Sequence, residues 1–178
     1  MLINADVSLP FPRSLVYLTY RDKLVELVPY LPNVRSVEVK SRREENQQVH
    51  CVNLWHGGGR IPPLLRALVG EAMLSWTEYN TWDESKYTVE WRIETHLFAE
   101  AVFCGGKNCF LEKNGTTIIE TRGELRIDPK KIEGFPESLK GKIASMVENF
   151  LGDKIVPNLL QMGQEVHNYL ERKKGSIS

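Results

Sequence analysis

Hydrophobic and polar residues alternate along most of the first 127 positions, which is the period of strands that bury one face. Stretches of this kind predict seven strands, over residues 3–9, 34–40, 49–56, 74–82, 87–96, 98–112 and 116–127. The sixth strand should bend at Gly105-Gly106, and the Asn114-Gly115 pair predicts a tight turn into the seventh. The short connections between the strands favour an antiparallel meander.

Three short segments interrupt this alternation with helical spacing. Apolar residues at steps of three and four predict helices over 12–21 and 23–31, the second closed by Pro32. A third short helix is predicted over 61–69. The run Gly57-Gly58-Gly59 before it is interpreted as a flexible turn, and the alternative is a hinge that lets 61–69 act as a lid over a cavity.

The longest helical pattern covers residues 137–173. Its apolar residues recur at steps of three and four and form one stripe: Leu139, Ile143, Met146, Val147, Phe150, Leu151, Ile155, Leu159, Met162, Val166 and Leu170. At 1.5 Å per residue the helix would be about 55 Å long, longer than any strand, so it should lie diagonally across the whole sheet. Pro157 cannot donate a backbone hydrogen bond, and we expect it to kink the helix.

Composition and charge are those of one folded domain, which we place at residues 1–174, with a disordered tail at 175–178. The 178 residues are 42% hydrophobic, and 23 basic residues balance 23 acidic ones. A neutral chain is a poor candidate for binding nucleic acid, which needs a basic surface. No stretch is apolar enough for stable membrane insertion. Three cysteines and the absence of an export signal predict reduced thiols and a cytoplasmic location.

The order of the predicted elements is distinctive: one strand, two short helices, a run of antiparallel strands and a long C-terminal helix. The best-matching part is N-terminal, where a strand ends at Pro10-Phe11-Pro12, a helix contains Val16-Tyr17 and Tyr20-Arg21-Asp22, and Leu31-Pro32 precedes the second strand. This arrangement resembles the START/Bet v 1-like superfamily with its helix-grip fold, which includes lipid-transfer domains and polyketide cyclases. The resemblance implies an α+β fold, with a curved seven-stranded sheet wrapped on the long helix. It also implies a hollow between them for an apolar ligand.

Large side chains of the sheet and of the helix are predicted to line this hollow. They are Trp55, Trp76, Tyr79, Trp91 and Ile93 on the strands, and Met146, Phe150, Leu159 and Met162 on the helix. Aromatic side chains on a concave sheet face offer broad apolar contact with an occasional polar group. For any one of them the alternative is ordinary core packing, and the case for a cavity rests on their number and on the fold.

A catalytic interpretation centres on His96 as an acid or base, with Glu94 or Arg92 either tuning it or holding an oxyanion. These residues belong to a charged row that alternates with Trp91 and Ile93. Because neighbouring strand residues point to opposite faces, and the apolar face belongs inside, the charged row should face solvent. Ion pairs on such a face contribute little to stability.

No residue pattern predicts a metal site or a cofactor. His50 and Cys51 are adjacent on a strand and point to opposite faces, so that, even with His56, they make a poor ligand set. Cys104 and Cys109 lack the close pairing of zinc sites.

Three functions follow from these observations. The leading one is non-catalytic binding or transport of a hydrophobic small molecule, such as a lipid, an isoprenoid or a polyketide. The alternative is a cyclase/dehydratase-type enzyme that uses His96, and the third is a partner-binding module with a filled core. A cavity that contains titratable groups would favour the enzyme, an apolar cavity the binder, and a solid core the module. The sequence leaves the ligand and the oligomeric state open.

Overall fold

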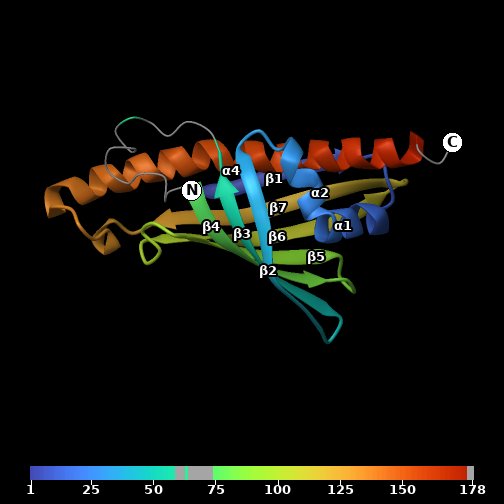
Figure 1. Ribbon diagram of the computed structural model, residues 1–178, viewed down its shortest axis with the longest axis horizontal. Helices are drawn as coiled ribbons and strands as arrows, with labels where there is room; N and C mark the ends of the chain where they lie inside the picture. Colours follow the sequence, from blue (N-terminus) through green and yellow to red (C-terminus); the bar gives the residue numbers. More distant parts are fainter. Residues whose placement is uncertain (59–62, 64–73, 176–178) are drawn as a thin grey trace.

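The computed structural model describes residues 1–58, 63 and 74–175, and these form a seven-stranded antiparallel sheet with a long helix across it (Figure 1). The strands are β1 (Leu2–Leu9), β2 (Val34–Glu45), β3 (Gln48–Gly57), β4 (Ser75–Asp83), β5 (Thr88–Thr95), β6 (Val102–Lys113) and β7 (Thr116–Ile127). The helices are α1 (Arg13–Asp22), α2 (Leu24–Leu27) and α4 (Glu137–Gly175), with 3-10 turns η1 (Val28–Tyr30) and η3 (Pro129–Lys131). The predicted α+β architecture is confirmed.

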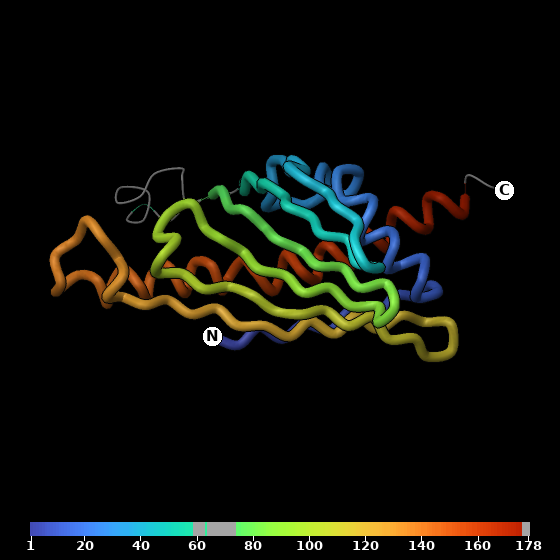
Figure 2. Tube along the Cα trace, turned by 90° about the horizontal axis from the view of Figure 1, so that it is seen from below, coloured from blue at the N-terminus to red at the C-terminus, as the bar shows by residue number. Residues whose placement is uncertain are grey.

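The strands follow one another across the sheet in the order β1-β7-β6-β5-β4-β3-β2, so only β1 is displaced from its place in the sequence. The sheet is open, because β1 and β2 are its two edges (Figure 2). Asn114 and Gly115 have φ angles of 52° and 75°, the left-handed backbone that a two-residue hairpin turn requires, as their sequence predicts. Asn46 and Gln47 make the corresponding turn between β2 and β3.

Two strand boundaries differ from those predicted by more than one residue. The sixth strand begins at Val102, because Phe98 has a φ of 56° and its carbonyl accepts hydrogen bonds from Ala101 and Val102 in a turn. The second strand continues beyond residue 40 to Glu45, where it pairs with β3. Its last residues are exposed on both faces, so they show no alternation. The predicted helix at 61–69 and most of the predicted tail lie outside the described residues.

Helix α4 crosses the concave side of the sheet (Figure 1). Its 39 residues span about 58 Å at 1.5 Å per residue. The helix continues without interruption through Pro157, and a bend there stays a prediction. It lies close against β1 at Gly163, where an added Cβ atom would come within 2.5 Å of Val7 Cγ1.

The core is closely packed towards both ends of this helix. At one end the buried ring of Tyr17 makes edge-to-face contacts with Trp82, Tyr87 and Phe110, at centroid distances of 5.2–5.3 Å. Towards the other end, the first turns of α4 bury a second group of apolar side chains around Ile143. The space between these two clusters is only partly filled.

Candidate ligand-binding site

A pocket of about 390 Å³ lies between the concave face of the sheet and α4. Strands β2 to β6, both short helices and the middle of α4 contribute to its wall. Sites for small molecules commonly have volumes of roughly 300–1,000 Å³ and mostly apolar walls. The pocket therefore has the size and the surface of a small-molecule site.

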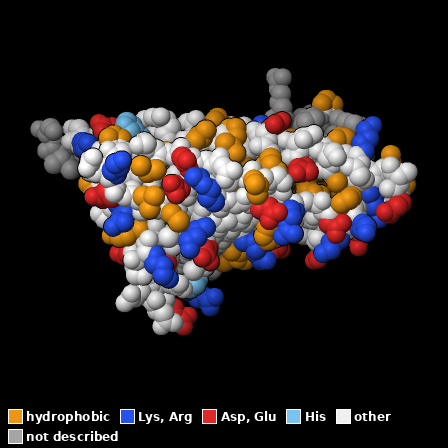
Figure 3. Space-filling model, turned by 180° about the vertical axis from the view of Figure 1, so that it is seen from behind, with side chains coloured by type: hydrophobic (Ala, Val, Ile, Leu, Met, Phe, Trp, Pro, Cys, Tyr) orange, Lys and Arg blue, Asp and Glu red, His pale blue; other side chains and the backbone are white. Residues whose placement is uncertain are grey.

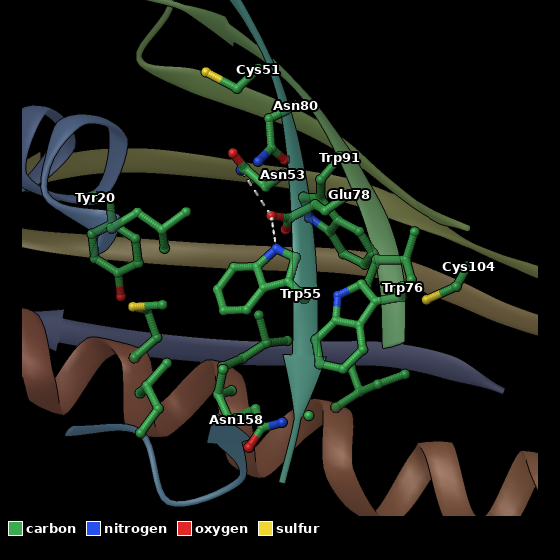
Figure 4. A pocket seen from close by; sticks show the side chains of 18 of the residues that line it. Tyr20, Cys51, Asn53, Trp55, Trp76, Glu78, Asn80, Trp91, Cys104 and Asn158 are labelled. Carbon is green, nitrogen blue, oxygen red and sulfur yellow. Dashed lines mark hydrogen bonds between the residues drawn. The ribbon is translucent and has the colours of Figure 1, made fainter. Parts of the chain in front are cut away.

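Seven of the nine predicted ligand contacts line this pocket: Trp55, Trp76, Trp91, Ile93, Phe150, Leu159 and Met162. Trp55 and Trp76 sit opposite each other on β3 and β4, and their rings stack with an interplanar angle of 9° at a centroid distance of 5.8 Å. Their side chains face the pocket in Figure 4. Their contact with a ligand stays a prediction.

The other two predicted contacts do not line the pocket. Tyr79 is out of phase with Trp76 along β4, and its ring lies under the guanidinium of Arg92 at 4.9 Å on the opposite face of the sheet. Met146 lies on the apolar stripe of α4, but about one turn before the helix reaches the pocket at Phe150. There it packs in the cluster around Ile143 and Val147.

His96, Glu94 and Arg92 lie outside the pocket, on the face that the alternation predicts to be solvent-exposed. The imidazole of His96 makes hydrogen bonds with Ser75 Oγ at 2.8 Å and Thr77 Oγ1 at 3.0 Å. Arg92 pairs with Glu94 over 3.5 Å. None of the three side chains lines this pocket, and a catalytic role for them stays a prediction.

The sequence reasoning overlooked a carboxyl group in the pocket wall, that of Glu78 on β4. Its Oε2 accepts a hydrogen bond from the indole Nε1 of Trp55 over 2.8 Å and another from Nδ2 of Asn53 over 3.3 Å (Figure 4). The signal was available, because Glu78 stands two residues after Trp76 and therefore shares its face.

Burial raises the pKa of Glu78 above its usual value. Hydrogen bonds from Trp55, Asn53 and Asn80 favour the charged form and oppose this effect, but they do not cancel it. The protein thus supplies neutral hydrogen-bond donors to this carboxyl and an environment that favours its protonated form.

Asparagine side chains continue the polar strip that Glu78 begins. Asn53, Asn80 and Asn108 are buried, at 3%, 8% and 9% exposure, and all three line the pocket. Asn108 Oδ1 accepts a hydrogen bond from the indole Nε1 of Trp91 over 2.9 Å. The concave face therefore carries a narrow polar strip among tryptophans, and a ligand with a polar group would find partners there.

Burial also disfavours the charged forms of two cysteines and a tyrosine that line the pocket. Burial raises the pKa of the Cys104 thiol to about 12, and the nearby carboxyl of Glu78 adds to the effect. Burial likewise raises the pKa values of Cys51 and Tyr20, whose side chains line the same wall.

The pocket reaches the surface between the short helices and β2. Val25 and Val39 line it and are 58% and 45% exposed. Asp22 stands beside this opening and accepts hydrogen bonds from Arg21 Nε over 2.9 Å and from Arg42 Nη1 over 2.8 Å. Burial raises the pKa of Asp22, but the two guanidinium groups outweigh it and hold the pKa below its usual value.

The described part of the chain offers neither a metal centre nor a membrane-spanning helix. Within residues 1–58, 63 and 74–175 no three His, Cys, Asp or Glu side chains gather in a way that could hold a metal ion. None of the helices in these ranges is long and apolar enough to cross a bilayer. On the face that Figure 3 shows, acidic and basic side chains are intermingled, and no large area has one sign of charge.

Comparison with solved structures identifies the architecture. The Zhui aromatase/cyclase from a Streptomyces species superposes with a TM-score of 0.67 at 15% identity, over 97% of this chain and 94% of that one. The protein TTHA0849 of Thermus thermophilus gives 0.64 at 19% identity, over 93% and 97%. Norcoclaurine synthase from Thalictrum flavum gives 0.62 at 9% identity, over 96% and 86%.

This chain has the helix-grip fold of the START/Bet v 1-like superfamily. The likeness lies in the fold, because the identities are low. No protein-family model matches the sequence, and no curated protein matches it.

Proposed function

We propose that this protein binds a hydrophobic small molecule in the pocket between its sheet and α4. The observation that carries the proposal is the pocket itself, about 390 Å³ of space walled by tryptophans and aliphatic side chains. Protein interiors are packed as densely as organic crystals and keep few voids larger than a water molecule. A hollow of this size, in a core that has large aromatic side chains at hand to fill it, is therefore best explained by a ligand.

The side chains of the pocket wall indicate which class of ligand would fit. Trp55 and Trp76 on β3 and β4 and Leu159 and Met162 on α4 enclose the space from both sides. Such surfaces suit a lipid, an isoprenoid or an aromatic polyketide, which bury large apolar areas. Transport of such a molecule would use the opening beside Asp22 for exchange.

A second candidate is an acid–base enzyme of the cyclase/dehydratase type. Glu78 favours it, because a titratable carboxyl in an apolar pocket is a common starting point for general acid–base chemistry. In this form of the proposal Glu78 takes the place of His96, which does not reach the pocket. Two of the similar structures are enzymes by name, an aromatase/cyclase and a synthase, which adds weight to this candidate. The third function, a module with a filled core, is not proposed.

The binding proposal can be tested with diphenylhexatriene, an apolar dye that fluoresces when it leaves water. Wild-type protein should bind the dye saturably. Ile93→Trp places a large ring in the pocket and should weaken binding by about tenfold or more, or 1.4 kcal/mol. Arg92→Trp adds the same ring one residue earlier, on the opposite face, and should leave the affinity within about twofold.

Absence of saturable binding to the wild-type protein, or equal effects of the two variants, would contradict a ligand site in this pocket. Native mass spectrometry of gently purified protein complements the test, because a retained ligand reports its own mass. The cytoplasmic location and the lack of a nucleic-acid partner stay predictions from the sequence.

A further inference from the structure

Among the residues that the structure describes, no cationic side chain pairs with the carboxyl of Glu78. The cationic side chains that line the pocket are Arg21 and Arg42, which bind Asp22 at the opening, and Lys154 of α4, which points to Asn33 with Nζ 3.5 Å from Oδ1. Within the described part of the chain, the donors to Glu78 are neutral side chains of β3 and β4. An enclosed carboxyl group without a cationic partner is costly in its charged form.

The hydrogen bonds from Trp55 and Asn53 favour one oxygen of a neutral Glu78 as the site of its proton. Trp55 and Asn53 both donate to Oε2, so this oxygen acts as the carbonyl acceptor of the acid. The hydroxyl group then falls on Oε1, where it becomes a donor. Figure 4 shows the carboxyl group among the tryptophans that line the pocket. A protonated Glu78 is thus a hydrogen-bond donor on the polar strip of the wall, among the tryptophans that line the pocket.

We propose that the pocket selects apolar ligands that carry a neutral hydrogen-bond acceptor, such as a ketone or ester carbonyl, and that Glu78 Oε1 donates to this oxygen. The proposal rests on the proposed function and names the polar group of its ligand. The position of Glu78 supports it, because Glu78 pairs with Asn53 and Ile93 on the two neighbouring strands and so lies inside the sheet, away from both edges. A ligand that fills the pocket would place its polar atom against this group and its apolar body against the tryptophans.

Binding should then depend on pH in one direction. Burial raises the pKa of Glu78, so protonation extends above the usual range of a glutamate. Loss of the proton turns the donor into a carboxylate that repels the lone pairs of a carbonyl oxygen. The other ionisable groups on the wall are Tyr20, Arg21, Asp22, Arg42, Cys51, Cys104 and Lys154. Burial raises the pKa values of the Cys51 and Cys104 thiols, so both stay uncharged as Glu78 ionises.

Two apolar dyes of similar size separate this inference from simple hydrophobic binding. Prodan carries a ketone, and its emission shifts to the red when that ketone accepts a hydrogen bond, whereas diphenylhexatriene has no polar atom. We expect Glu78→Leu to weaken the binding of prodan by about tenfold, which is the scale of one buried hydrogen bond. The same variant should bind diphenylhexatriene with unchanged or higher affinity. The red-shifted emission of bound prodan should disappear in the same variant.

Glu78→Gln gives a second test that does not depend on the folding of the leucine variant. A glutamine side chain can accept from Trp55 through its carbonyl and donate to the dye through its amide, so prodan binding should persist. In this variant the affinity for prodan should not depend on pH. In the wild-type protein the affinity for prodan should fall as the pH rises through the pKa of Glu78. Thermal unfolding of both variants confirms that they are folded.

The outcomes are distinct. Equal losses of both dyes in Glu78→Leu, or wild-type prodan binding that strengthens as the pH rises, would overturn the donor role of Glu78. A cationic analogue of diphenylhexatriene that binds tighter than either neutral dye, and loses this advantage in Glu78→Gln, would instead make the site one for protonated amines. If neither dye binds to the wild-type protein, the binding function itself fails together with this inference.

Discussion

The indole of Trp91 lies so close to Gly106 on the neighbouring strand that a Cβ atom there would come within 2.6 Å of Trp91 Cζ2. The ring extends further, to Gly123 on the next strand, where an added Cβ would be 2.9 Å from the same ring. Trp91, Gly106 and Gly123 are paired in one row across β5, β6 and β7. The two glycines therefore leave room for the indole against the sheet, and the space above it stays open as the pocket.

Replacing Gly106 by alanine should disturb both stability and binding. The new methyl group would overlap the backbone carbonyl oxygen of Arg122 and the Trp91 ring, and overpacking of this kind costs about 1–3 kcal/mol. Displacement of the Trp91 ring into the pocket should also weaken the binding of diphenylhexatriene. Gly105→Ala is the matched control, because its Cβ points to the other face and would meet its nearest atom, the Trp91 carbonyl oxygen, at 3.2 Å. Denaturant unfolding and dye titration should show the larger loss for Gly106→Ala, and equal losses would refute this account.

Helix α4 allows a second comparison between two glycines in one element. A Cβ at Gly141 meets no atom within 4 Å, so Gly141→Ala should stabilise the protein by about 0.5–1 kcal/mol through helix propensity alone. Gly163→Ala gains the same propensity but places its methyl 2.5 Å from Val7 Cγ1. We expect net destabilisation for Gly163→Ala. Opposite signs in urea unfolding are the expected result, and a stabilised Gly163→Ala would show that β1 and α4 are not held together at this point.

The fold was within reach of the sequence because its elements are long and strongly patterned. Strict alternation located the strands, and Asn114-Gly115 located a hairpin turn that the structure has with the expected backbone. The errors fall where tertiary contacts decide the backbone. Phe98 enters a turn instead of a strand, and the end of β2 is held by its pairing with β3 rather than by a buried face.

The candidate site was less accessible to sequence reasoning. Alternation places Trp76 and Glu78 on one face, but only large apolar and aromatic side chains were expected to line the cavity, so the carboxyl was missed. What makes its burial tolerable comes from other residues, Trp55 and Asn53 on β3, whose register with β4 a single sequence does not show. Met146 shows the same limit for the helix. The stripe predicts a buried face, but not which of its turns lie over the pocket.

The cysteines should report on the pocket through their rates of alkylation. Cys104 has a pKa of about 12 and is 2% exposed, so few of its thiols are ionised and fewer are reachable. Because the thiolate is the nucleophile, Cys104 should react with a maleimide at least about a hundredfold more slowly than the partly exposed Cys109. Labelling read out by peptide mass spectrometry should also show three free thiols in denaturant. Similar rates for Cys104 and Cys109 in the native protein would argue against a closed wall on β6.

The raised pKa of Glu78 predicts how folding stability changes with pH. Between its usual value of 4.5 and its higher value in the native protein, the folded state holds a proton that the unfolded chain has released. Since stability falls with rising pH wherever the folded state binds more protons, Glu78 should destabilise the protein progressively across this range. Below it, both states are protonated and the contribution is constant, which gives an internal reference for the measurement.

Glu78→Gln keeps the shape of the side chain and removes the titration. The difference in unfolding free energy between this variant and the wild-type protein should therefore be constant in acid and should shift in favour of the variant as the pH rises through the range set by Glu78. Urea unfolding at a series of pH values measures this difference directly. A difference that shifts towards the wild-type protein instead would mean that the carboxylate of Glu78 is stabilised in the fold by the donors Trp55 and Asn53. Glu78 could then not serve as the hydrogen-bond donor of the pocket.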